Sequence, residues 1–201
     1  MTRIAPPETP TAEQAALFDQ CDARLGFVPM TLRVMANRPE MLDAWYRLIS
    51  EVYLKPGDVP APLRRLIAHT VARIAECPYS MAHTAEAAFE AGVPIEKIRA
   101  VMNSDSDPQF DDAERAALAV ARASAAAPAS VDDELFDALR PHFTEAQMLE
   151  IMAVISLFGF LTRWQSGLAL TLEDKPRHFA EENLAEIGWA IGQHGGNETA
   201  D

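Results

Sequence analysis

Helical periodicity interrupted by turn signals runs through most of the chain, and no segment shows the apolar–polar alternation of a strand. Thr11-Ala12-Glu13-Gln14 has the pattern of a capping box, and Gly26 is suited to end the helix that this box opens. Pro39 and Pro94 suit the first turns of two further helices. The sequence therefore predicts an all-α fold, with helices over 11–25, 31–36, 39–52, 63–75, 81–91, 94–102, 111–126, 131–139, 144–170 and 176–191.

Proline and glycine mark the expected domain limits. Residues 1–10 are proline-rich and predict a flexible, extended arm, and residues 192–201 predict a flexible tail. Residues 55–62 form the clearest loop, because three prolines and a glycine fall within them. We therefore expect a single helical domain over 11–191, in which this loop separates an N-terminal lead-in from a core unit of about 63–126.

Composition excludes several functional classes. The net charge of −13 provides no basic surface for nucleic acid or for an anionic membrane. The two cysteines, Cys21 and Cys77, do not form a disulfide framework, and we expect Cys21 to serve in packing. Cys77 and His83 alone would leave a metal undercoordinated, so we expect no metal site. With no apolar signal core at the N-terminus and no uninterrupted apolar stretch near ~18 residues, we predict a cytoplasmic protein.

The segment Cys77-Pro78-Tyr79-Ser80-Met81-Ala82-His83 carries the candidate chemistry. A Cys-x-x-Cys-x-x-His arrangement would be a dithiol redox site with an acid/base group, but the second cysteine is replaced by Ser80. Pro78 suits a first helical turn, so Cys77 lies at a helix N-terminus, which favours the thiolate. Ser80 cannot resolve a sulfenic acid into a disulfide. A reactive Cys77 thiol and a buried, inert one both fit this pattern.

The chain resembles the alkyl-hydroperoxidase D-like (AhpD-like), or carboxymuconolactone decarboxylase, superfamily in its peroxidase-related branch. The resemblance extends over about residues 20–175 and is carried by Leu25–Pro29, Arg38–Trp45, Leu63–Ala68, Cys77–Tyr79, Phe110–Leu118 and Phe143–Arg163. It implies an all-α, AhpD-like helical bundle with extra N-terminal lead-in and C-terminal helices. It also implies a peroxiredoxin-like antioxidant oxidoreductase that needs no cofactor and forms a homo-oligomer. For the oligomer, we expect contacts through the apolar faces of 135–139 and 151–161.

Three positions depart from the superfamily pattern. Arg65 replaces a glutamate twelve residues before Cys77, Ser80 replaces the second cysteine, and Thr84 replaces a histidine seven residues after Cys77. His83 matches another form of the motif. The resemblance therefore implies a weak or impaired thiol-dependent peroxide reductase in which Cys77 is the nucleophile.

Several side chains around the motif have two interpretations. His83 and His69 are candidates to move the proton, although His69 stands in an apolar stretch typical of a core histidine. Arg65 lies four residues before His69, on the same helical face, and is either a carboxylate or peroxide ligand or a surface residue. We expect Arg65, Tyr79, Ser80 and Thr84 to line the motif.

Two other functions fit the same residues. A cofactor-free decarboxylase-type lyase does not need a cysteine pair, and Arg65 with the histidines would then hold a small carboxylate. A non-catalytic member would bind a ligand or partner. The expected partners are thus a small peroxide or carboxylate, an external thiol reductant and further copies of the chain, with neither nucleic acid nor membrane.

Overall fold

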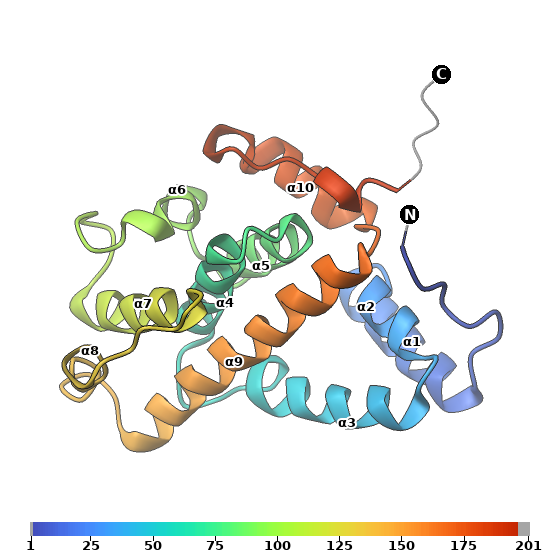
Figure 1. Cartoon of the computed structure of the whole chain (residues 1–201), viewed down its shortest axis with the longest axis horizontal. Helices are drawn as coiled ribbons and strands as arrows, with labels where there is room; N and C mark the ends of the chain where they lie inside the picture. Colours follow the sequence, from blue (N-terminus) through green and yellow to red (C-terminus); the bar gives the residue numbers. More distant parts are fainter. Residues whose placement is uncertain (1, 197–201) are drawn as a thin grey trace.

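In the computed structural model, which describes residues 2–196, the chain contains ten α-helices and no strand. This confirms the predicted all-α class (Figure 1). The helices are α1 (Ala12–Leu25), α2 (Met30–Met35), α3 (Pro39–Ile49), α4 (Ala61–Ile74), α5 (Pro78–Glu90), α6 (Ile95–Arg99), α7 (Asp112–Ala125), α8 (Asp133–Asp137), α9 (Glu145–Leu168) and α10 (Asp174–Asn183).

Helix α9 runs diagonally through the molecule and separates two groups of helices (Figure 1). On one side it packs against α4, α5 and α7, and these elements share the larger hydrophobic core. On the other side lies the layer of α1–α3, which has a smaller core of its own. Trp164 of α9 packs against both cores, so this helix joins the two layers.

Side-chain caps fix several helix starts where the sequence predicts them. Thr11 and Gln14 form the capping box of α1, and Gly26 ends this helix with a left-handed φ of 81°.

The loop before α4 is held by α9. The carboxylate of Glu150 accepts hydrogen bonds from the backbone N–H groups of Asp58 and Val59, at 2.9 and 3.0 Å. A Cβ at Gly57 would stand 2.0 Å from Glu150 Oε1, so a larger residue there would require this carboxylate to move.

The C-terminal part differs from the sequence prediction. Helix α10 ends at Asn183 instead of near 191, and Gly188 adopts a left-handed φ of 81° that an ongoing helix does not allow. Residues 192–194 form a short 3₁₀ turn in which His194 is fully buried, so the predicted flexible tail is wrong for this part. The remaining tail residues, 197–201, lie outside the described part. Residues 184–196 are called the C-terminal strap below.

The N-terminal arm has no regular secondary structure and is bound to the body of the molecule. The backbone N–H of Arg3 donates to Leu168 O at 2.9 Å, and Thr2 Oγ1 lies 3.0 Å from Thr171 Oγ1. The Asn37 side chain donates to Ala5 O at 2.9 Å. The arm is thus held against both α9 and the end of α2.

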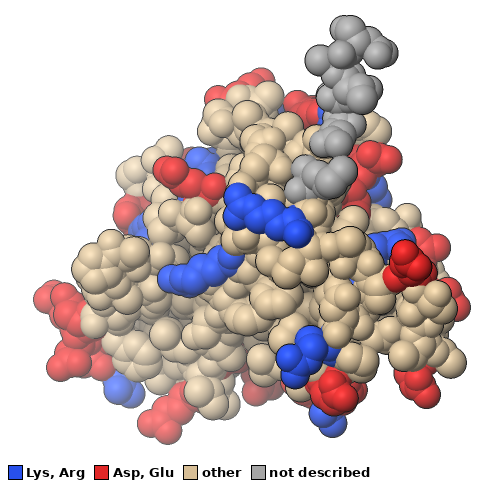
Figure 2. All heavy atoms as spheres, turned by 45° about the vertical axis from the view of Figure 1, so that its right-hand side comes forward, with Lys and Arg blue, Asp and Glu red and all other residues tan. Residues whose placement is uncertain are grey.

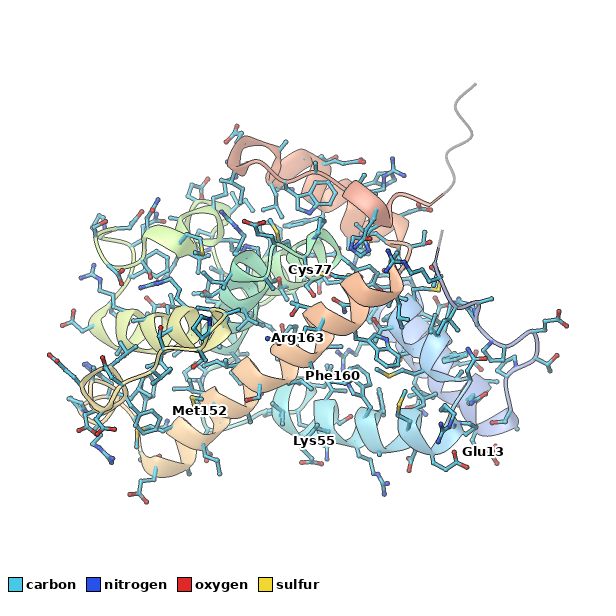
Figure 3. All side chains as sticks on the ribbon, viewed as in Figure 1. Glu13, Lys55, Cys77, Met152, Phe160 and Arg163 are labelled. Atoms are coloured by element: carbon cyan, nitrogen blue, oxygen red, sulfur yellow. The ribbon has the colours of Figure 1, made fainter. Side chains whose placement is uncertain are left out.

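One face of α9 remains open. Leu149 is 72% exposed and Phe160 is 43% exposed, and a groove of about 680 Å³ runs along α9 beside the ends of α4 and α7. Figure 3 labels Met152, Phe160 and Arg163 along this helix, and Figure 2 shows charged residues scattered over a largely uncharged face. Helix α9 is long and apolar enough for a membrane span, but its packing on α4, α5 and α7 is that of a core helix. The expected homo-oligomer stays a prediction.

Candidate functional site

Cys77 is the N-cap residue of α5 and is fully buried (Figure 3). The turn that leads to it is held by the Cys77 N–H, which donates to Ala72 O of α4 at 3.2 Å. Glu76, just before it, has a left-handed φ of 47°, which is uncommon outside glycine. Pro78 occupies the first turn of α5, as its residue type predicts. The helix therefore begins three residues before residue 81, the start expected from the sequence. The thiol therefore sits at the first turn of α5, where unpaired backbone N–H groups favour a negative charge.

Gln165 of α9 covers the thiol. The Cys77 Sγ lies 3.9 Å from Gln165 Oε1, and the same oxygen accepts the hydroxyl of Ser80. Gln165 Nε2 donates to Thr31 Oγ1 at 3.3 Å, which ties the amide to α2. Ser80 thus occupies the place of the second cysteine and shares its hydrogen-bond acceptor with the thiol of Cys77.

His194 reaches the same region from the C-terminal strap. Its Nδ1 lies 2.6 Å from Leu170 O, and because a carbonyl only accepts, Nδ1 carries the hydrogen. Nε2 then holds the lone pair of the neutral ring; it is buried and has no hydrogen-bond partner of ordinary geometry within residues 2–196. The strap is fixed beside Cys77 because Trp189 Nε1 donates to Pro78 O at 3.0 Å. Leu172 N donates to His194 O at 2.9 Å.

The pKa of the Cys77 thiol is lowered despite its burial. Burial alone raises the pKa, but hydrogen bonding to His194, Ser166 and Ser80 more than offsets this effect. A lowered pKa increases the fraction of thiolate, which is the nucleophilic form. His194 is therefore a candidate base for the Cys77 thiol, and Leu170 O holds the Nδ1 side of its ring.

His69 does not belong to this arrangement. It is fully buried, and its Nδ1 lies 2.9 Å from Thr84 Oγ1, which itself donates to Ser80 O. Burial and the nearby charge of Arg73 lower the pKa of His69 to about 3, so it stays neutral and is a weak base. The proton-moving role of His69 stays a prediction, while its bond to Thr84 holds α4 against α5.

His83 binds Glu173 instead of the thiol. Its Nε2 lies 2.7 Å from Glu173 Oε2, and its ring stacks on Tyr79 with centroids 4.5 Å apart. The Tyr79 hydroxyl donates to Glu173 Oε1 at 2.7 Å, and the backbone N–H of Met30 donates to the same oxygen. His83, a candidate to move the proton, and Tyr79, a candidate to line the motif, share a carboxylate partner that comes from the segment before α10.

A cavity of about 500 Å³ lies between the α1–α3 layer and the helices α4, α5 and α9. Of the predicted site residues, it brings together Arg65, Tyr79, Ser80, His83 and Thr84. Aromatic side chains form much of the wall, namely Phe27, Trp45, Tyr46, Tyr53 and Phe158. Gln165 and Ser80 line this cavity and also contact Cys77, so they stand between the cavity and the thiol.

Residues 39–123 match the model of the carboxymuconolactone decarboxylase family. This match supports the assignment of the segment around Cys77 to that superfamily. The match covers the lead-in helix α3 and the core from α4 to α7, including Cys77. The resemblance that the motif indicates is thereby confirmed.

Solved structures of the superfamily fold are similar over most of this chain. The debrominase Bmp8 is 29% identical in its apo form, with a TM-score of 0.80 over 90% of this chain and 98% of that chain. A Cys→Ala variant of Bmp8 has been solved with 2,3,4-tribromopyrrole and is 28% identical over 90% of this chain and 97% of that chain, also with a TM-score of 0.80. A peroxidase-related protein with an AhpD core, from Ralstonia eutropha JMP134, shares the fold at 21% identity, a TM-score of 0.79, and coverage of 89% and 95%.

A curated relative is the uncharacterized protein YnjA of Escherichia coli (strain K12). It is 30% identical over 106 residues, which are 53% of this chain and 58% of YnjA. The chain thus spans less than two thirds of the length of this relative.

Sequence reasoning did not find two residues of the site, Gln165 and His194. Gln165 stands near the polar C-terminal end of α9, beside Arg163 and Ser166, and His194 falls in a glycine-rich segment that suggests a tail. No local spacing connects either residue with Cys77.

Replacing Gln165 by alanine is expected to expose the thiol. Three hydrogen bonds hold this amide in place, and each contributes about 0.5–1.5 kcal/mol. In a Cys21→Ser background, iodoacetamide should therefore modify Cys77 about tenfold faster in Gln165→Ala than in the parent. Gln109→Ala serves as the control, because it changes an exposed glutamine in the loop before α7. An unchanged rate in Gln165→Ala would mean that the reagent reaches Cys77 by another route.

Proposed function

We propose that this protein is a thiol-dependent reductase of small organic hydroperoxides, with Cys77 as its nucleophile. The observation that carries the proposal is the buried Cys77 thiol at the first turn of α5, whose pKa is lowered most strongly by His194. The apolar cavity next to this pair has a size suited to a small organic molecule.

The first step consumes the peroxide. His194 Nε2 takes the thiol proton, and the thiolate of Cys77 attacks the terminal oxygen of ROOH. The O–O bond breaks, the S–O bond forms, and the alkoxide takes the proton back from His194. The products are ROH and the sulfenic acid of Cys77, so the peroxide is reduced and the sulfur is oxidised.

The second step needs an external thiol. Ser80 has no sulfur to attack the sulfenic acid, so a thiol R′SH forms a mixed disulfide with Cys77 and releases water. A second R′SH then frees the Cys77 thiol and leaves as R′SSR′. Because both steps are bimolecular and Gln165 covers the thiol, we expect slow turnover in comparison with a dithiol enzyme.

Consumption of cumene hydroperoxide with dithiothreitol tests the proposal. The parent protein and Cys21→Ser should both consume the peroxide, whereas Cys77→Ser should lose the activity completely. Dimedone, which traps sulfenic acids, should add to Cys77 after peroxide treatment, as seen by mass spectrometry. Equal background rates in the parent and in Cys77→Ser, with no adduct, would refute the proposal and favour a binding protein.

Reduction of halogenated aromatic molecules is a second candidate. It is favoured by the similarity to Bmp8 over 90% of this chain and by the aromatic wall of the cavity. The overall reaction would be ArBr + 2 R′SH → ArH + HBr + R′SSR′, in which the carbon–bromine bond is reduced and the thiols are oxidised. Bromide release from 2,3,4-tribromopyrrole with dithiothreitol, lost in Cys77→Ser, would support this candidate over the peroxidase.

A further inference from the structure

Three buried hydrogen-bond donors in the cavity wall have no acceptor. They are Arg65 Nη1, Tyr53 Oη and Trp45 Nε1, none of which has a hydrogen-bond partner in the part of the chain that the structure describes. Buried polar groups are nearly always hydrogen-bonded, so a group of three exceptions in one cavity needs an explanation. All three can donate, which indicates a missing acceptor.

Arg65 provides the charge of this group. Its Cζ lies 3.6 Å from the centroid of the Tyr53 ring, so the guanidinium stacks on the aromatic face. Tyr53 is itself fixed by Phe158, with ring centroids 4.7 Å apart at 62°. Stacking occupies the flat face of a guanidinium but leaves its N–H edge available, and that edge fits a carboxylate with two parallel hydrogen bonds.

The acidic residues of the cavity do not neutralise Arg65. Glu86 and Glu90 are the acids that line it, and both contact Lys175, at 3.4 and 2.9 Å. A second arginine, Arg24, lies at the exposed rim, and no ion pair of Arg24 is found among residues 2–196. In a chain of net charge −13, this cavity thus keeps two arginines without carboxylate partners. Arg24 is exposed to water, but the buried Nη1 edge of Arg65 has no counterion, which is unfavourable, and a bound anion would relieve it.

The rest of the cavity wall indicates which chemical groups the bound anion contains besides its charge. Its wall includes Leu32, Ile49 and Leu161 besides the aromatic side chains, and its volume of about 500 Å³ exceeds that of a simple ion. We propose that Arg65, together with Tyr53 and Trp45, binds the carboxylate of a small apolar or aromatic acid in this cavity. The site stands on these contacts alone, whereas the claim that the acid is a substrate rests on the proposed function.

Calorimetry with 2-naphthoate and 2-naphthamide tests the site, because the two probes match in shape and differ in charge. The parent protein should bind 2-naphthoate, and Arg65→Gln should weaken this binding by about 10- to 100-fold, the usual effect of losing a charge-assisted pair. Binding of 2-naphthamide should be weaker and unaffected by Arg65→Gln. Arg47→Gln, at a 73% exposed arginine paired with Asp43, is the matched control and should bind as the parent does.

Further variants separate this site from the redox proposal. Cys77→Ser should bind 2-naphthoate like the parent. The carboxylate site can therefore be refuted while the thiol chemistry is supported, and the thiol chemistry can be refuted while the site is supported. Tyr53→Phe, which removes one donor and keeps the ring, should weaken binding several-fold. If Arg65→Gln does not fold, Arg65→Lys and the comparison of 2-naphthoate with 2-naphthamide on the parent protein still test whether the cavity binds a carboxylate. Equal affinity for the two probes, an unchanged affinity in a folded Arg65 variant, or no binding of 2-naphthoate at millimolar concentration would overturn the inference.

Discussion

The His194→Asn variant is expected to raise the pKa of the Cys77 thiol and to slow its alkylation at neutral pH by about 10- to 100-fold. Hydrogen bonding to His194 is the largest of the effects that offset burial at Cys77. Without the imidazole, burial dominates and the neutral thiol is favoured. Asparagine retains a donor for Leu170 O, so the C-terminal strap should stay in place. Peroxide turnover in the proposed reaction should fall with the thiolate fraction.

A titration in a Cys21→Ser background separates this effect from a change in access. The ultraviolet absorbance of the thiolate, titrated against pH, reports the pKa without any reagent, and Cys77→Ser provides the blank. The inflection should lie below the usual range of a cysteine in the parent and move upward in His194→Asn. The groups that face the thiol and remain in both proteins are Ser80, Gln165 and Ser166. A titration curve that does not move would show that His194 only supports the strap.

The sequence predicted the helices well because their ends are encoded locally. Thr11 with Gln14 forms the capping box that the sequence predicts, and the start of α7 at Asp112 lies within one residue of the predicted start. Pro78 likewise places Cys77 at the N-terminus of α5. Such signals depend on residues within one turn of each other, so one sequence is enough to find them.

The site was less predictable because its contacts are not local. A spacing of four residues puts Arg65 and His69 on one helical face, but α4 is buried on several sides, so this face does not define a single neighbour. Arg65 reaches the cavity, whereas His69 points to Thr84. The C-terminal strap lies beside Cys77 because Gly188 ends the 3₁₀ turn that follows α10 and Trp189 donates a hydrogen bond to Pro78. These are tertiary contacts that periodicity does not encode.

Glu173→Ala is expected to destabilise the fold by about 3–5 kcal/mol, the usual cost of removing one member of a buried charged network. The carboxylate accepts hydrogen bonds from the Tyr79 hydroxyl and Met30 N–H and pairs with His83, thereby joining α2, α5 and α10. Glu173→Gln keeps the shape and one acceptor, so its cost should be about 1–2 kcal/mol. Urea unfolding measures both. Glu181→Ala, which removes a surface pair with Arg177 at 2.8 Å, should change stability by at most about 0.5 kcal/mol.

The same network predicts how stability depends on pH. Burial raises the pKa of Glu173, but the charge of His83 and hydrogen bonds from His83, Met30 and Tyr79 outweigh it, so the net pKa lies below the usual 4.5. A carboxyl whose pKa is lower in the folded state stabilises the fold above its unfolded pKa, and this contribution is lost as pH falls through the folded value. The difference in unfolding free energy between the parent and Glu173→Ala should therefore be largest at neutral pH and shrink below about pH 4. A difference that stays constant across this range would mean that Glu173 acts through packing and not through its charge.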